Sequence, residues 1–218
     1  MKPRHYSFLT IFFVLLGCAK ENNQQDLKPG IEIIAWGDSL TKGLGNKEAY
    51  PYMLQQLSSI KVDNRGIGGE TSTQIKARMI SDTTGYKKPV IIWAGRNNLI
   101  HPQTVKADID SMVSKLGHQH YVILGILNAD KVDEYSGTSK HDIVVKLNAD
   151  LAAKYSDHFI DIRSILIAGY DPQKPLDVEN FNNDVPPHSL RLDYVHLTVS
   201  GYKVVAKSVY EKINLLTN

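Results

Sequence analysis

The amino-acid sequence predicts an α/β protein of one domain, a three-layer α/β/α sandwich around a parallel five-stranded sheet. Short apolar runs rich in β-branched residues alternate with longer segments of helical periodicity, and this alternation is typical of βαβ units. The chain has 218 residues, 42% of them hydrophobic and 22% charged, which is enough for one substantial core. No internal repeat and no second domain is evident.

The strands are expected where short buried runs end in turn-forming residues. The first, Ile31-Glu32-Ile33-Ile34-Ala35-Trp36, is mostly β-branched and leads into a glycine-containing turn. In chain order, the five strands are expected near residues 31–36, 61–64, 89–93, 120–127 and 158–161.

The helices are expected between these runs, near residues 49–59, 71–80, 103–116, 139–155 and 199–214. Thr71 or Ser72 is expected to cap the second helix, and Pro102 stands where the third begins. The last helix carries an apolar stripe suited to packing on a sheet, made of Val204, Val205, Val209 and Ile213. Residues 169–192 contain four prolines among several Asn and Asp residues, so a long irregular loop is expected there.

The N-terminus reads as a targeting segment over residues 1–18. Basic Lys2 and Arg4 precede a nine-residue run, Phe8 to Leu16, that only Thr10 interrupts. This run is too short for a spanning helix, which needs about 20 apolar residues. It ends in Leu-Leu-Gly-Cys18, which resembles the lipobox of bacterial lipoproteins, and Cys18 is the only cysteine. The alternative is an ordinary secretory signal with an incidental cysteine.

The lipobox resemblance implies lipid attachment at Cys18 and a protein anchored to a membrane of the bacterial cell envelope, periplasmic or surface-exposed. Residues 19–29 are polar and read as a flexible tether, so the folded domain is expected over residues 30–218. Without Lys2 and Arg4, the chain has 23 basic and 23 acidic residues. A neutral chain has no electrostatic reason to bind nucleic acid.

Four polar blocks each lie beside an apolar run: Trp36–Leu40, Asn64–Thr71, Gly95–Asn98 and Asp193–Thr198. Parallel strands present such blocks together at their carboxyl edge, where ligands bind. A Gly-Asp-Ser turn on its own is more often structural, with Asp and Ser bonding nearby backbone N–H groups. A catalytic serine would also need a base and a carboxylate that orients it, and the last block supplies His and Asp.

These four blocks, in this order, resemble the SGNH (GDSL) hydrolase family over nearly the whole expected domain. The family's markers match Ser39, Gly69, Asn97 and His196. The resemblance implies a flavodoxin-like fold and a serine esterase with Ser39 as nucleophile, His196 as base and Asp193 as its orienting carboxylate. It also implies an oxyanion hole made of the N–H groups of Ser39 and Gly69 and the side-chain amide of Asn97.

The chain departs from the family pattern at Asn98, where an aspartate is commoner, and this affects support of the Asn97 loop. Neighbouring Arg96 is expected either to meet an anionic substrate group or to pair with a structural carboxylate. No His, Asp or Glu cluster has metal-ligand spacing, so neither a metal nor another cofactor is expected. The remaining histidines are read as surface or packing residues: His5, His101, His118, His120, His141, His158 and His188.

The expected activity is hydrolysis of carboxylic esters through an acyl-enzyme on Ser39. Residues 169–192 are expected to wall the site, and their polar, proline-rich character favours a short acyl group, such as acetyl on carbohydrate, over a long chain. Alternatively this segment is a solvated connection and the pocket lies elsewhere. The rival functions are a lysophospholipase or thioesterase, an O-acyltransferase, and a non-catalytic binding protein, which retention of all four markers argues against.

Overall fold

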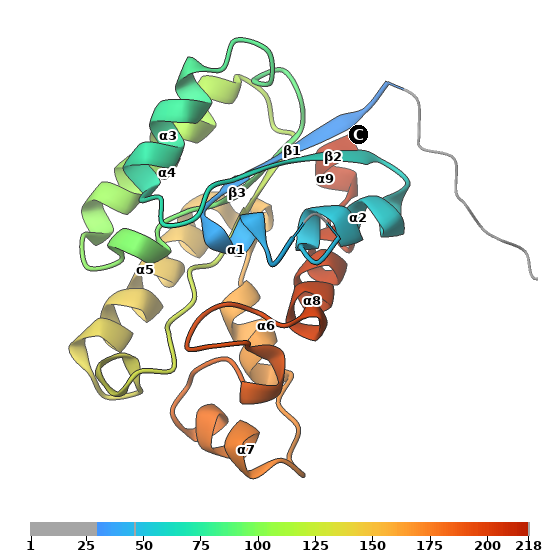
Figure 1. Cartoon of the computed structure of the whole chain (residues 1–218). Helices are drawn as coiled ribbons and strands as arrows, with labels where there is room; N and C mark the ends of the chain where they lie inside the picture. Colours follow the sequence, from blue (N-terminus) through green and yellow to red (C-terminus); the bar gives the residue numbers. More distant parts are fainter. Residues whose placement is uncertain (1–29, 46, 218) are drawn as a thin grey trace, which may run out of the picture.

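A computed structural model of the chain describes residues 30–45 and 47–217. The predicted leader (residues 1–18), Cys18 and the predicted tether (residues 19–29) lie outside the described residues. The described part forms a parallel five-stranded sheet in the order β2-β1-β3-β4-β5, with helices on both faces (Figure 1). This architecture confirms the predicted fold class.

All five predicted strands are present: β1 (Glu32–Gly37), β2 (Lys61–Gly66), β3 (Val90–Trp93), β4 (Tyr121–Leu124) and β5 (Phe159–Ile160). The fourth strand is shorter than the expected 120–127. It stops at Leu124 because the side-chain amide of Asn148 bonds both the N–H and the C=O of Ile126, each at 2.8 Å, in place of a neighbouring strand.

The longer helices are α2 (Tyr50–Ser58), α3 (Ser72–Ser81), α4 (Pro102–Leu116), α5 (Ser139–Tyr155) and α8 (Val199–Tyr210). The shorter ones are α1 (Ser39–Lys42), α6 (Ile162–Ala168), α7 (Pro175–Asn182) and α9 (Asn214–Thr217), with 3₁₀ turns η1 (Arg96–Asn98), η2 (Val132–Glu134), η3 (Ser156–His158) and η4 (His188–Leu190). Thr71 caps α3 in a reciprocal capping box with Gln74, and α4 begins at Pro102, as expected. Among the described residues, every helix is too short or too polar to cross a lipid bilayer.

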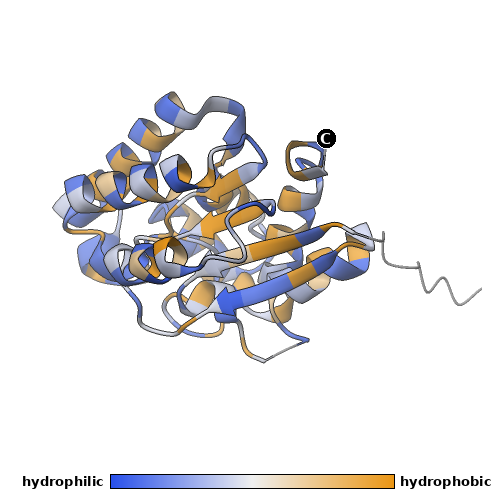
Figure 2. Cartoon of the chain, turned by 90° about the horizontal axis from the view of Figure 1, so that it is seen from above, coloured by the Kyte–Doolittle hydropathy of each residue, from blue (hydrophilic) through white to orange (hydrophobic). Residues whose placement is uncertain are grey.

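The core has two parts, one on each face of the sheet, because successive strand residues point to opposite faces. On β1, Ile33 and Ala35 pack against α2, α6 and α8, whereas Ile34 and Trp36 pack against α3, α4 and α5. Figure 2 shows the central strands as apolar and the edge strand β2 as largely hydrophilic. The centre of the sheet is therefore packed on both faces, and the Gly-Asp-Ser turn lies at the end of β1 there.

The prediction of an irregular loop over residues 169–192 was wrong in part, because this segment contains α7 and η4. Pro175 opens α7 in the position where its missing N–H is harmless. Buried Asp177 then bonds the Ser189 N–H at 2.8 Å and the Ser189 hydroxyl at 2.5 Å, which joins α7 to η4. These contacts link residues 12 positions apart and leave little local signal in the sequence.

Candidate active site

Ser39 is the first residue of α1, directly after the turn that ends β1. The Asp38 carboxylate caps this helix by accepting a hydrogen bond from the Leu40 N–H at 2.8 Å. A side chain at Gly37 would place its Cβ 2.1 Å from the Thr41 hydroxyl and 2.7 Å from the Trp93 carbonyl oxygen. Only glycine fits there, so β1 can turn tightly into α1 and present the half-buried Ser39 at the carboxyl edge of the sheet.

The structure brings Ser39, His196 and Asp193 together in one chain of hydrogen bonds. The Ser39 Oγ lies 2.9 Å from His196 Nε2, across 157 residues of sequence. On the other side of the ring, His196 Nδ1 lies 2.7 Å from Asp193 Oδ2. With Nδ1 facing the carboxylate, Nε2 is the ring nitrogen that can accept a proton from the serine hydroxyl.

The Asp193 carboxylate is itself held by the backbone of its own turn. Its Oδ1 accepts hydrogen bonds from the N–H groups of Val195 and His196, each at 2.8 Å. Burial acts to raise the pKa of Asp193, but these two N–H groups and the imidazole outweigh it, so the net effect is a lowered pKa. The carboxylate therefore stays ionised and can stabilise a positive charge that develops on His196.

The two other predicted oxyanion donors lie on loops beside this turn. Gly69 is exposed and has a φ of +79°, and no atom lies within 4 Å of where its Cβ would be, so conformation rather than space favours glycine there. A Cβ on the neighbouring Gly68 would lie 3.9 Å from the Ser39 Cβ, which places this loop against Ser39.

Asn97, in η1, donates its side-chain amide to the Glu70 carbonyl oxygen at 2.8 Å and to Asp38 Oδ2 at 3.3 Å. The first bond ties η1 to the loop that holds Gly69. The second bond is longer and therefore weaker. Neither Gly69 nor Asn97 forms a hydrogen bond with Ser39 in the described part of the chain.

Sequence reasoning gave Asp38 no role beyond the structural one that such turns usually have, and it does bond a nearby N–H. The structure adds that Asp38 is only 1% exposed. Burial raises the pKa of its carboxyl to about 6, while the Leu40 N–H and the charges of Arg96 and His196 act in the opposite direction. A carboxyl with a raised pKa thus directly precedes Ser39 in the chain.

Of the two alternatives for Arg96, the structure shows pairing with a structural carboxylate. Its guanidinium makes two parallel hydrogen bonds to Glu134, each 2.8 Å long, and both side chains are largely buried. Glu134 also accepts the Ala129 N–H at 2.7 Å, so this pair fixes η1 to the segment after β4.

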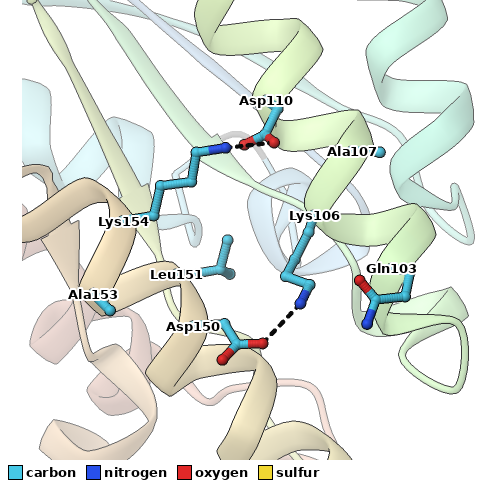
Figure 3. A pocket seen from close by; sticks show the side chains of 8 residues that line it. All are labelled: Gln103, Lys106, Ala107, Asp110, Asp150, Leu151, Ala153 and Lys154. Atoms are coloured by element: carbon cyan, nitrogen blue, oxygen red, sulfur yellow. Dashed lines mark hydrogen bonds and ion pairs between the residues drawn. The ribbon is translucent and has the colours of Figure 1, made fainter.

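A hollow of about 650 Å³ lies between α4 and α5, away from the Ser39 turn (Figure 3). Charged side chains line it, but they neutralise one another: Lys106 pairs with Asp150 at 2.7 Å and Lys154 with Asp110 at 2.5 Å. Because its charged side chains are paired with one another, the volume of this hollow alone gives no chemical reason to place the reaction there. Within the part of the chain that the structure describes, no three His, Cys, Asp or Glu side chains form a group that could hold a metal ion.

Comparison with solved structures gives the same fold at low sequence identity. An acetyl xylan esterase, AlAXEase, is 20% identical with a TM-score of 0.64 over 84% of this chain and 100% of that one. A member of the lipolytic protein G-D-S-L family from Veillonella parvula DSM 2008 is 16% identical with a TM-score of 0.64 over 84% of this chain and 98% of that one. At these identities the likeness establishes the shared fold.

One curated protein shares sequence with part of the chain. The tail spike protein of Salmonella phage epsilon15 is 29% identical over 111 residues, which is 49% of this chain, and the match covers only 10% of that protein. The model of the GDSL-like lipase/acylhydrolase family matches residues 35–204, which include the Ser39 turn, the Gly69 and Asn97 loops and the Asp193–His196 turn. The chain therefore belongs to the GDSL-like lipase/acylhydrolase family, a family of ester-bond hydrolases, as its sequence blocks predicted.

Proposed function

We propose that this chain is a serine esterase that hydrolyses carboxylic esters through an acyl-enzyme on Ser39. The observation that carries the proposal is the chain of hydrogen bonds from Ser39 Oγ through the His196 ring to Asp193, at 2.9 and 2.7 Å. A serine hydroxyl is a weak nucleophile until a base takes its proton, and His196 Nε2 lies within reach of that proton. Asp193 keeps the ring in the required tautomer and stabilises the imidazolium that forms.

In the first step, Ser39 Oγ attacks the ester carbonyl carbon while its proton passes to His196. The tetrahedral oxyanion is stabilised by the N–H of Ser39 and Gly69 and by the Asn97 amide, after Asn97 gives up its long bond to Asp38. The N–H of Ser39 suits this role because the first N–H groups of a helix have no partner within it. His196 then protonates the alcohol that leaves, and a water molecule cleaves the acyl-enzyme by the same steps in reverse order.

For the substrate, we propose esters with a short acyl group, such as acetyl on carbohydrate. Of the large apolar residues of segment 169–192, Tyr170 stacks on Phe181 with ring centres 4.1 Å apart and Leu190 packs against the core, whereas Leu176 and Leu192 are exposed. They do not supply the continuous apolar lining that a long acyl chain needs, at about 0.8 kcal/mol for each buried CH₂. The structural neighbour named acetyl xylan esterase supports this choice, although a shared fold alone does not determine the substrate.

Two measurements test these proposals. Ser39→Ala should remain folded by circular dichroism and lose ester hydrolysis to near background, whereas the matched Ser111→Ala, on the exposed face of α4, should keep it. Retention of most activity by Ser39→Ala would exclude an acyl-enzyme on Ser39. For the substrate, kcat/KM along a series from acetyl to palmitoyl esters should fall with acyl length; a steady rise would reject the short-acyl proposal and favour a lysophospholipase.

A further inference from the structure

We propose that Arg191 is the positioning residue of the catalytic turn, defined as residues 192–196, and that it holds Asp193 and His196 in register with Ser39. The catalytic role of this turn rests on the function proposed above, whereas its position is a property of the structure. Arg191 lies just outside the Asp-x-x-His block, and neither the sequence blocks nor the family markers assign it a role.

Most of the catalytic turn is exposed, and Val195 is its one buried residue. Leu192 is 62% exposed and Tyr194 is 47% exposed. At the base of the turn, Arg191 and Leu197 form an isolated antiparallel bridge, and the Leu192 N–H donates to the His196 carbonyl oxygen at 2.7 Å. These backbone bonds close the turn, but they do not fix its orientation relative to Ser39.

The Arg191 guanidinium fixes that orientation through hydrogen bonds to the turn and to neighbouring segments. Its Nη1 donates to the Asp193 carbonyl oxygen at 2.7 Å, and its Nε donates to the Pro186 carbonyl oxygen at 2.6 Å. Its Nη2 donates to Asp130 Oδ2 at 2.7 Å and to Asn180 Oδ1 at 2.9 Å. The Arg191 side chain is only 2% exposed, so these bonds do not compete with water.

The partners of Arg191 come from separate parts of the fold. Asp130 follows β4, and Asn180 lies on α7, the helix within the segment expected to be a loop. The Asp130 N–H also donates to the Tyr194 carbonyl oxygen at 2.8 Å, so the carbonyl groups of two successive residues of the turn, Asp193 and Tyr194, are both hydrogen-bonded to the rest of the fold. Movement of the turn would have to break bonds to both segments.

Only arginine can make this set of bonds. Its planar guanidinium presents donors in a fixed fork that reaches acceptors in several directions, whereas a lysine ammonium is a compact charge on a flexible stem. Arg191→Lys therefore keeps the positive charge beside Asp130 and loses the bonds that orient the turn. This substitution separates positioning from electrostatics.

Arg163 provides a matched control. Its side chain is 7% exposed, and its guanidinium donates to Asn128 at 2.9 Å and to the Asp184 carboxylate and carbonyl oxygen at 2.5 and 2.8 Å. It is therefore a second buried arginine that ties a loop aspartate to the body of the protein. Its bonds go to Asn128, His141 and Asp184 rather than to residues 192–196.

The experiment compares Arg191→Lys with Arg163→Lys in the purified protein, by urea unfolding, by kcat and KM for an acetyl ester, and by the far-downfield proton resonance of His196 Nδ1–H. Both variants should lose stability. Arg191→Lys should lower kcat by about tenfold to a hundredfold with little change in KM, because misplacing a catalytic group by about 1 Å can cost a hundredfold. It should also broaden or shift the His196 resonance, and Arg163→Lys should leave kcat and the resonance unchanged.

Equal effects of the two variants on kcat and on the resonance would overturn the proposal. If Arg191→Lys does not fold, Asp130→Ala decides the question, since it removes the carboxylate that accepts a hydrogen bond from Arg191 Nη2 and leaves the arginine in place; an unchanged kcat and resonance would then refute the positioning role. The resonance does not depend on turnover. Retained activity in Ser39→Ala would therefore refute the proposed function while leaving the positioning of His196 measurable.

Discussion

Replacement of the buried Asp38 by Asn is expected to stabilise the protein at neutral pH and to change its stability little at acidic pH. The amide oxygen of Asn can still accept the Leu40 N–H that Asp38 Oδ1 accepts at 2.8 Å, so the cap of α1 is kept. The substitution removes a carboxyl group that is only 1% exposed. This group ionises at neutral pH, although burial disfavours its charged form.

The magnitude follows from the pKa of Asp38, which burial raises from the ordinary 3.8 to about 6. Each unit corresponds to 1.36 kcal/mol, so the shift of about 2 units amounts to roughly 3 kcal/mol. Below about pH 4 the carboxyl is protonated in both the folded and the unfolded chain, and its ionisation costs nothing. As the pH rises from about 4 to about 6, the unfolded chain loses its proton first, so the folded wild type loses stability relative to the variant.

The assay is urea unfolding of wild type and Asp38→Asn at several pH values from 4 to 8. The free energy of unfolding of the variant, relative to wild type, should increase by roughly 3 kcal/mol across this range. Any loss of the weak Asn97 bond enters as an offset that does not depend on pH. If the difference in the free energy of unfolding between variant and wild type stays constant from pH 4 to 8, burial does not raise the pKa of Asp38 and the argument is refuted.

Asp177→Asn is the control of opposite sign. Asp177 is also 1% exposed, but its bonds from Ser189 and the Asp171 N–H outweigh burial and lower its pKa. Its carboxylate therefore stabilises the folded state above the ordinary pKa of aspartate, and this contribution is lost as the pH falls through the lowered pKa. Asp177→Asn should be less stable than wild type at neutral pH, and the difference should shrink in acid.

The remaining predictions concern the catalytic turn and the N-terminus. His196→Ala should lower kcat by about 10³-fold or more, and Asp193→Asn by a similar or smaller factor, because the carboxylate orients the ring without transferring the proton. Steady-state rates check this, and a rate unaffected by His196→Ala would show that another group is the base. Cys18→Ser should release the protein from membranes or leave an uncleaved precursor, which mass spectrometry of the native N-terminus checks; an unmodified N-terminus at another position would mean an ordinary signal peptide.

The central strands were predictable because burial on both faces determines their composition. Val90–Trp93 and Tyr121–Leu124 are buried along their whole length, so each appears in the sequence as an uninterrupted apolar run, although the apolar run after Leu124 continues past the end of the strand. The helix α7 was not predictable in this way. Its buried residues, Asp177 and Asn180, are polar, and they are stabilised by Ser189 and Arg191, far along the chain.

The same distinction holds for the candidate site. Ser39 and the Asp193–His196 pair were singled out because each belongs to a short block with its own local signal. The contacts that orient them have no such signal: Arg191 meets Asp130 across 61 residues, and Arg96 meets Glu134 across 38. Sequence patterns thus indicated which groups come together, whereas their rigid placement depends on pairs that only the fold brings into contact.

The departure from the family pattern at Asn98 follows from such a pair. Asn98 accepts the Ser72 N–H at 3.0 Å and donates its amide to the Ser72 hydroxyl at 2.9 Å, and that hydroxyl donates its single proton to Asp108 at 2.6 Å. Burial acts to raise the pKa of Asp108, but Lys76 and the hydroxyls of Ser72 and Thr73 outweigh it and keep it ionised.

A carboxylate at position 98 would have no hydrogen to give the Ser72 hydroxyl, and it would compete with Asp108 for the one proton that Ser72 has. The amide of Asn98 resolves this conflict because it supplies both an acceptor and a donor. Through Ser72 it ties η1 to the start of α3, while Asn97 bonds the Glu70 carbonyl oxygen at 2.8 Å on the same loop. In this chain Asn98 and Asp108 together therefore hold the Gly69 and Asn97 loops as one unit, in the place where a single aspartate is commoner.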